Sequence, residues 1–183
     1  GRLPNVTGPI VILPSPTPGG PNDILSSDVT LLLVEGDVWR YFKGTQEPSG
    51  GDLTAWTRLG FDDDAWFAGP SGFGYGPDCN PFGTVLGDML GGYASVYIRR
   101  SFQIDDPNAV TELTLTVDYD DSFVAYINGV EVGRRNVVGV PPAFNQLATV
   151  DHECSGSPVG ANPPESFLIH VGFNLSTLLQ PGV

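Results

Sequence analysis

Residues 123–132 have the sequence Phe-Val-Ala-Tyr-Ile-Asn-Gly-Val-Glu-Val, and this stretch decides the fold class. Two apolar runs, 123–127 and 130–132, flank the dipeptide Asn128-Gly129. Asn-Gly is the preferred centre of a type I′ turn because both central residues need positive φ, and this turn matches the twist of two antiparallel strands. The stretch therefore predicts a β-hairpin whose turn is formed by Asn128 and Gly129.

Further strand patterns surround this hairpin on both sides. Residues 113–119 alternate Leu, Val and Tyr with Thr and Asp, as expected of a strand with one buried face. Similar segments, bounded by Gly, Asp or Pro, cover residues 29–34, 38–42, 93–104 and 167–173. Helical periodicity is almost absent, apart from one short turn that Asn174 can cap. Many short strands separated by turn clusters predict an all-β fold, namely an antiparallel β-sandwich or jelly roll.

The composition supports this fold class. The chain has 183 residues, enough for one domain with a substantial core, and 24 are Gly and 17 are Pro. Glycine loses backbone entropy in a helix and proline interrupts its hydrogen bonds, so this content disfavours a helical protein.

The charge balance excludes two classes of partner. The chain has eight Lys and Arg residues and 21 Asp and Glu residues, which gives a formal net charge of −13. Such a surface repels phosphate backbones and anionic headgroups. No apolar run reaches the roughly 18 residues that cross a bilayer. We therefore predict neither nucleic-acid binding nor membrane insertion.

The N-terminal residues differ from the rest of the chain. Residues 1–28 form a predicted arm with one strand, Ile10, Val11, Ile12 and Leu13, and a Pro/Gly-rich spacer from Pro14 to Pro21. The spacer can form neither a sheet ladder nor a helix, and we expect it to be extended. We expect residues 29–183 to form the sandwich domain.

Two cysteines, Cys79 and Cys154, lie in loops rich in Gly, Pro and Asn or Ser. Loops without a core of their own gain most from a cross-link, so we predict a disulfide between them, with a pair of free thiols as the alternative. A disulfide indicates an oxidising compartment, and we expect an extracellular or cell-surface location.

Several segments together resemble a known family. Residues 36–41 (GDVWRY), 56–66 (WTRLGFDDDAW), 72–76 (GFGYG), 97–102 (YIRRSF) and 120–132 (DDSFVAYINGVEV) follow the order found in galactose-binding-like jelly-roll modules. These modules belong to large secreted bacterial proteins and are similar to the sugar-binding domain of family 2 glycosidases. The resemblance covers about residues 29–183 and implies the fold, which hosts carbohydrate binding, adhesion and purely structural roles.

The chain departs from that family at its two ends. Members usually continue beyond the equivalent of Pro181-Gly182-Val183 into a final apolar strand, and many lack a strand ahead of a Pro-rich spacer. We therefore expect the sandwich to be one strand short and the arm to carry one additional strand.

Two aspartate clusters offer the hard oxygen ligands that Ca²⁺ requires. They are Asp62, Asp63 and Asp64, and Asp118, Asp120 and Asp121. Adjacent aspartates also form turns through side-chain to backbone hydrogen bonds. A structural calcium ion is consequently one interpretation and turn formation is the other. Structural calcium is common in the resembled fold.

Three aromatic residues, Trp39, Tyr75 and Phe82, are candidates for stacking on a sugar ring, with core packing as the alternative. Arg100 falls in the apolar row of residues 93–104 and must either have a charged partner or emerge at the end of the sheet, because an unpaired buried charge is costly. We expect that partner near Asp118, Asp120 or Asp121.

No pattern indicates catalysis. The histidines are His152 and His170, and neither a Gly-x-Ser-x-Gly elbow nor a His-Glu-x-x-His pair is present. We expect a non-catalytic subunit of an extracellular assembly, in which strand 10–13 completes the sheet of a neighbouring copy by β-augmentation. Its partners would be copies of itself or domains of a parent protein. The alternative is a carbohydrate-binding module of a larger secreted glycosidase or lyase, whose partner is a glycan.

Overall fold

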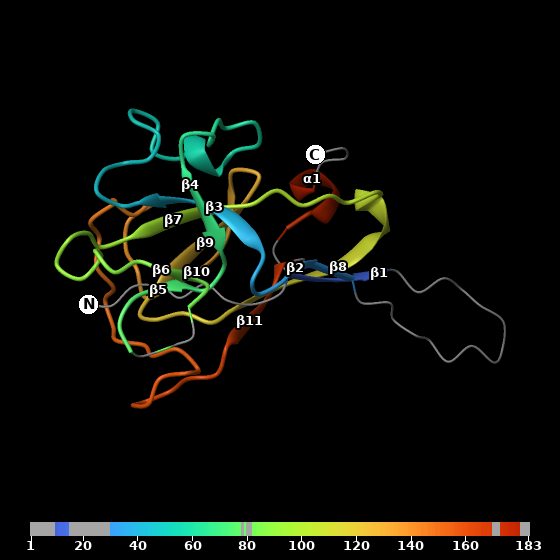
Figure 1. Ribbon diagram of the computed structural model, residues 1–183. Coiled ribbons are helices and arrows are strands. Elements are labelled where there is room, and N and C mark those ends of the chain that lie inside the picture. Colours follow the sequence, from blue (N-terminus) through green and yellow to red (C-terminus); the bar gives the residue numbers. More distant parts are fainter. Residues whose placement is uncertain (1–9, 15–29, 78, 80–81, 170–172, 180–183) are drawn as a thin grey trace.

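The computed structural model describes residues 10–14, 30–77, 79, 82–169 and 173–179 (Figure 1). Its strands are β1 (Ile10–Pro14), β2 (Thr30–Leu33), β3 (Val38–Lys43), β4 (Phe67–Pro70), β5 (Phe73–Gly74), β6 (Thr84–Val85), β7 (Val96–Arg99), β8 (Val110–Val117), β9 (Phe123–Ile127), β10 (Val130–Arg135) and β11 (Glu165–Leu168). The described helices are the short η1 (Ala55–Thr57), η2 (Pro107–Ala109) and α1 (Leu175–Leu178). The predicted all-β class is confirmed.

The largest sheet contains the N-terminal strand. Its order is β11-β8-β1-β2, and every neighbouring pair is antiparallel. Strand β8 alternates buried Leu113, Leu115 and Val117 with half-buried Thr114 and Thr116. This alternation is the predicted one, and it directs one face of β8 into the core.

The other strands form smaller groups. Strand β3 lies between β4 and β7 in an antiparallel sheet of three strands, β9 pairs with β10, and β5 pairs in parallel with β6. Figure 1 shows β1, β2 and β8 running side by side, with β3, β4 and β7 in a separate part of the fold.

Both local predictions about turns are confirmed. Asn128 and Gly129 have φ values of 48° and 85°, as a type I′ hairpin turn between β9 and β10 requires. The side chain of Asn174 accepts a hydrogen bond from the backbone N–H of Ser176 at 3.1 Å and caps α1.

Two strands are shorter than the alternation predicts. The expected strand 93–104 is reduced to β7, which ends at Arg99. The segment expected at 167–173 contributes β11, which begins at Glu165 and ends at Leu168, whereas residues 170–172 lie outside the described residues. An alternating pattern therefore marks a buried side better than it marks the length of a hydrogen-bonded ladder.

Two clusters of buried side chains make up the core. The larger cluster joins β2, β8, β9 and β10 to α1 and is centred on residues such as Leu113, Tyr119 and Phe123. The smaller cluster contains Phe73, Leu86 and Met89. Trp39 packs against both clusters and connects them.

Candidate functional site

The candidate functional site consists of β1 and the two strands that flank it in the large sheet, β8 and β2. β1 lies between β8 and β2 and pairs with both, so it is a central strand although it comes from the N-terminal arm. Without β1, the adjoining edges of β8 and β2 would present unpaired N–H and C=O groups. The sheet therefore depends on β1 to join β8 to β2.

The register places β1 against the core. Ile10 is the partner of Leu33 on β2 and of Leu115 on β8, and Ile12 is the partner of Leu113. Leu33 is 3% exposed, Leu115 is buried and Leu113 is fully buried. In an antiparallel pair, residues directly opposite each other belong to the same face of the sheet. Positions 10 and 12 consequently belong to the core face.

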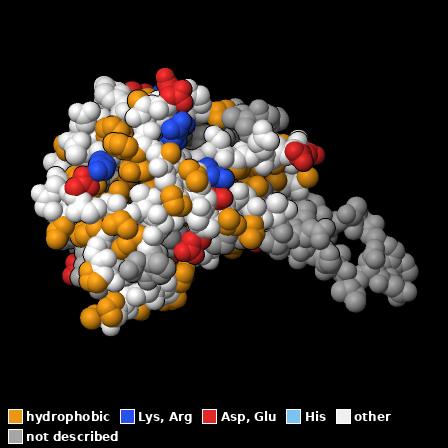
Figure 2. Space-filling view, in the orientation of Figure 1, with side chains coloured by type: hydrophobic (Ala, Val, Ile, Leu, Met, Phe, Trp, Pro, Cys, Tyr) orange, Lys and Arg blue, Asp and Glu red, His pale blue; other side chains and the backbone are white. Residues whose placement is uncertain are grey.

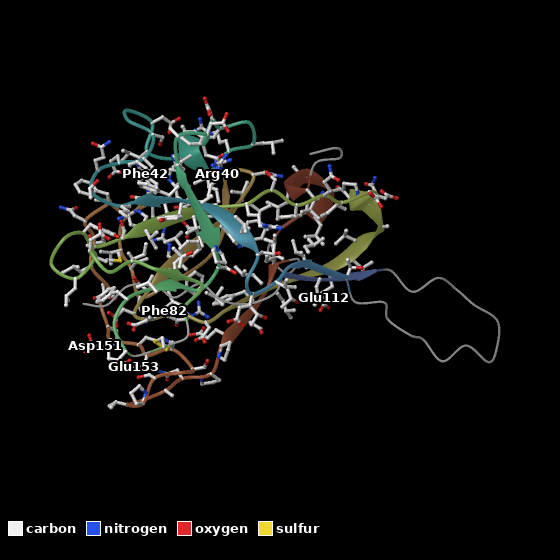
Figure 3. The ribbon with its side chains drawn as sticks, viewed as in Figure 1. Arg40, Phe42, Phe82, Glu112, Asp151 and Glu153 are labelled. Atoms are coloured by element: carbon white, nitrogen blue, oxygen red, sulfur yellow. A yellow bond between two sulfur atoms is a disulfide. The ribbon has the colours of Figure 1, made fainter. Side chains whose placement is uncertain are left out.

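The adjacent positions have different neighbours. Val11 is the partner of Leu31, which is 53% exposed, and of half-buried Thr114. Leu13 is the partner of Glu112, which lies on β8 and is labelled in Figure 3. On the β2 side a register shift lies between Ile10 and Val11, and Ile12 is opposite exposed Thr30, so the assignment of faces follows from the regular pairing with β8.

The connection between β1 and β2 is long for two strands that lie side by side. β1 ends at Pro14 and β2 begins at Thr30, so 15 residues, 15–29, join them. Adjacent antiparallel strands need only two to five connecting residues. The segment contains Pro16, Pro18 and Pro21 and two glycines, and its structure lies outside the described residues.

The predicted disulfide is present. Cys79 and Cys154 are bonded, with their Cα atoms 5.8 Å apart, and both side chains are buried. The bond joins two loops that are 75 residues apart in the sequence. The loop that leads to Cys154 carries Asp151 and Glu153 (Figure 3).

The first aspartate cluster engages arginines and a turn. Asp62 accepts the backbone N–H of Asp64 at 3.1 Å. Asp63 lies 3.2 Å from the guanidinium of Arg99, and Asp64 lies 3.6 Å from that of Arg40. These contacts are those of a turn that is fixed by ion pairs.

The second aspartate cluster holds the loop of Cys154. Asp118 accepts hydrogen bonds from the backbone and hydroxyl of Ser155, and Asp121 accepts the backbone N–H of His152 at 3.0 Å. Asp120 is buried. Within the described part of the chain, no three His, Cys, Asp or Glu side chains are arranged to hold a metal ion.

The three aromatic candidates contribute to packing. Trp39 and Tyr75 both contact the smaller core cluster. Phe82 lies close to Gly74 on β5, because a Cβ atom at Gly74 would come within 2.3 Å of the Phe82 ring (Figure 3). Glycine at position 74 therefore makes room for that ring.

The predicted partner of Arg100 is wrong. Arg100 follows the end of β7, pairs with Asp37 at 3.3 Å and donates a hydrogen bond to the carbonyl of Val38. Asp118, Asp120 and Asp121 are engaged around the loop that carries His152 and Ser155. Asp37 directly precedes β3, and the pairing of β3 with β7, which the sequence does not indicate, brings it close to Arg100.

His152 takes part in a polar network that the sequence did not indicate. Its ring stacks on Tyr119 with centroids 3.9 Å apart, and its Nδ1 lies 3.0 Å from the Tyr119 carbonyl oxygen. The Tyr119 hydroxyl donates to Glu165, which also accepts a hydrogen bond from Arg135. The network ties β11 to β10 and to the segment after β8, which is a structural role. His170 lies outside the described residues.

The described helices include none long and apolar enough to span a membrane. Comparison of the chain with protein families, with curated proteins and with solved structures found no match.

Proposed function

We propose that this chain is a non-catalytic structural or adhesive subunit of an extracellular or cell-surface assembly, and that β1 is exchanged between subunits. The observation that carries the proposal is the place of β1. It is the third strand of the sheet order β11-β8-β1-β2, yet a 15-residue Pro/Gly-rich segment separates it from β2. A strand held in this way can complete its own sheet or that of a neighbour.

Strand exchange follows from the energetics of the pairing. The same backbone pairing with β8 and β2 forms whether β1 comes from its own chain or from another copy, so the linker and the subunit concentration decide between the two. Fifteen residues in polyproline-like geometry reach on the order of 45 Å, which suffices to reach the sheet of an adjacent small domain. When each subunit donates to the next, the contact is head-to-tail and can extend into a fibre.

Two further features support the proposal, one for the location and one for the choice of an assembly over carbohydrate binding. The Cys79–Cys154 disulfide is typical of oxidising compartments. The three aromatic residues considered for sugar stacking contribute to packing, and we therefore favour the assembly over the carbohydrate-binding module.

Cross-linking tests the exchange directly. Leu13→Cys combined with Glu112→Cys places two thiols at opposed positions of β1 and β8, within reach of a disulfide. After oxidation of the purified assembly, non-reducing electrophoresis should show a ladder of covalent multimers. Cyclised monomers as the sole product at every protein concentration would overturn the proposal.

The hairpin provides the matched control. Val124→Cys with Arg134→Cys joins opposed positions of β9 and β10, which two residues connect. This pair should cross-link within one chain under all conditions, and its products define the monomer band. Electron microscopy of the same samples should show filaments in the assembled state.

A further inference from the structure

We propose that ionic strength controls strand exchange: the charge of the subunits opposes the exchange in dilute salt, and screening by mobile ions permits it. This inference rests on the proposed function, because it concerns the regulation of the exchange of β1. It follows from the distribution of charge in a subunit whose formal net charge is −13.

The basic side chains are already neutralised inside the subunit. Of the eight Lys and Arg residues in the chain, Arg2 lies outside the described residues, and each of the other seven is paired with a carboxylate of the same chain at 2.5 to 3.6 Å. The pairs are Arg40 with Asp64, Lys43 with Asp88, Arg58 with Asp52, Arg99 with Asp63, Arg100 with Asp37, Arg134 with Glu131 and Arg135 with Glu165. On the face shown in Figure 2, basic side chains accordingly lie beside acidic ones. An approaching subunit would have to break one of these pairs to gain a basic partner for its own carboxylates.

The place where β1 leaves the sheet is also acidic. Pro14, the last residue of β1, is the partner of Val110 at the start of β8. Three carboxylates lie close to Val110 in the sequence, and none of them forms an ion pair with a Lys or Arg side chain of the described residues: Asp105, Asp106 and Glu112. The 15–29 linker adds two aspartates and contains neither Lys nor Arg. Donor and acceptor therefore meet with charges of the same sign.

The reach of the linker makes this repulsion sensitive to salt. The screening length is about 30 Å at 0.01 M ionic strength and about 8 Å at 0.15 M. A linker that reaches about 45 Å keeps two subunits within roughly two screening lengths in the dilute salt, but holds them more than about five lengths apart at 0.15 M. A high net charge keeps proteins monomeric, and this effect should disappear for the exchange between these two salt concentrations.

The test measures exchange in the full chain with a cysteine pair that leaves the net charge unchanged. Val11→Cys with Thr114→Cys joins opposed positions of β1 and β8, and neither residue is charged. After oxidation at pH 7, the ratio of covalent multimers to cyclised monomers is compared at 0.01 M and 0.15 M NaCl, at one subunit concentration. We expect this ratio to be at least about ten-fold higher at 0.15 M, because only the screening differs. Circular dichroism shows that the subunit is folded at both salts, and the hairpin pair of Val124→Cys with Arg134→Cys should cross-link equally in both.

Charge variants test whether the net charge is the cause. Glu35, Asp105 and Asp151 are exposed, and the structure gives their carboxylates no hydrogen bond or ion pair with another described residue. Replacing all three by Lys changes each charge by two and the net charge from −13 to −7. Because the repulsion scales with the square of the net charge, a ten-fold effect of salt in the parent should become about two-fold. Glu35→Gln with Asp105→Asn and Asp151→Asn gives a net charge of −10 and about a four-fold effect, and it keeps the test valid where the lysine variant does not fold.

The identity of the cation separates screening from a bound ion. Tetramethylammonium chloride, whose cation cannot coordinate a carboxylate, should act as NaCl does at the same ionic strength. Cyclised monomers as the sole product at every salt and protein concentration would overturn the proposed exchange itself. A ladder of equal yield at both salts, a salt effect that both charge variants leave unchanged, or a requirement for sodium would overturn the control by screening and leave the exchange standing.

Discussion

The β9–β10 hairpin and the β1–β2 pair are both antiparallel, but they differ in how their strands are joined. Two residues, Asn128 and Gly129, connect β9 to β10, whereas 15 residues connect β1 to β2. The short turn fixes the register locally and keeps both strands in one chain. The long connection does not fix the register of β1 and β2 locally, and this is the property that the proposed strand exchange requires.

The largest expected effect comes from a charge on the core face of β1. Ile12→Asp places a carboxylate opposite fully buried Leu113, and we expect a loss of at least about 4 kcal/mol in the free energy of unfolding. Because the same strand would complete a neighbour's sheet, higher-order assembly should be lost as well. Thermal unfolding and light scattering measure the two effects.

Val11→Asp is the matched control for Ile12→Asp. It introduces the same charge one position away, opposite exposed Leu31 and half-buried Thr114. Its destabilisation should be much smaller. Equal losses in the two variants would contradict the register that places position 12 on the core face.

Removal of the disulfide should weaken the subunit and leave the exchange intact. The bond closes a loop of 75 residues, and the chain-entropy relation gives about 4 kcal/mol for such a loop. Cys79→Ala with Cys154→Ala should therefore lower the unfolding midpoint. Assembly below that midpoint should persist, since neither cysteine lies in the β1 sheet. Loss of assembly at a temperature where the double variant is folded would contradict this, because it would show that the disulfide-linked loops and the β1 sheet are coupled.

The comparison also explains which parts of the fold the sequence could predict. The hairpin, the alternating strand β8 and the cap at Asn174 depend on neighbouring residues, and all three are confirmed. The Cys79–Cys154 bond could be predicted because only two cysteines are present. By contrast, β4, β5 and β6 were not predicted. β4 has the sequence Phe-Ala-Gly-Pro, and β5 and β6 have only two residues each, so none of them shows an alternation of apolar and polar residues.

Contacts between distant segments were harder to assign. Arg100 was correctly expected to need a carboxylate, but the choice among 21 acidic residues required the knowledge that β3 pairs with β7. The strand 10–13 was recognised from its apolar run. Its position between β2 and β8 could not be predicted, because it follows from tertiary pairing alone. Local patterns determine elements, and the order of strands in a sheet is set by packing.

A smaller effect should come from the hairpin turn. Gly129 has a φ of 85°, and a Cβ atom there would lie 3.1 Å from Cγ of Arg58. Gly129→Ala should cost about 1–2 kcal/mol through the left-handed backbone and this close contact. Gly87→Ala is the control, because no atom lies within 4 Å of its Cβ position and its φ is not positive. Assembly should be unchanged in both variants, and a dependence of assembly on Gly129 would remove the contrast between the two strand pairs.

The smallest effect concerns Glu165 on the outer strand β11, whose side chain links this strand to Tyr119 after β8 and to Arg135 on β10. Burial raises the pKa of Glu165, but hydrogen bonds from Tyr119 and Arg135 outweigh it and lower the pKa below the ordinary value of 4.5. A lowered folded-state pKa means that the ionised carboxylate contributes stability above about pH 4.5, and that this stability is lost as the pH falls through the folded-state value. Glu165→Gln should therefore reduce the free energy of unfolding at pH 7 by about 1 kcal/mol, and the difference from the parent should shrink toward pH 3. Exposed Glu35→Gln is the control. Since other carboxylates titrate in the same range, the difference between variant and parent is the quantity to measure, and a difference that stays constant from pH 7 to pH 3 would contradict the role of the Glu165 charge.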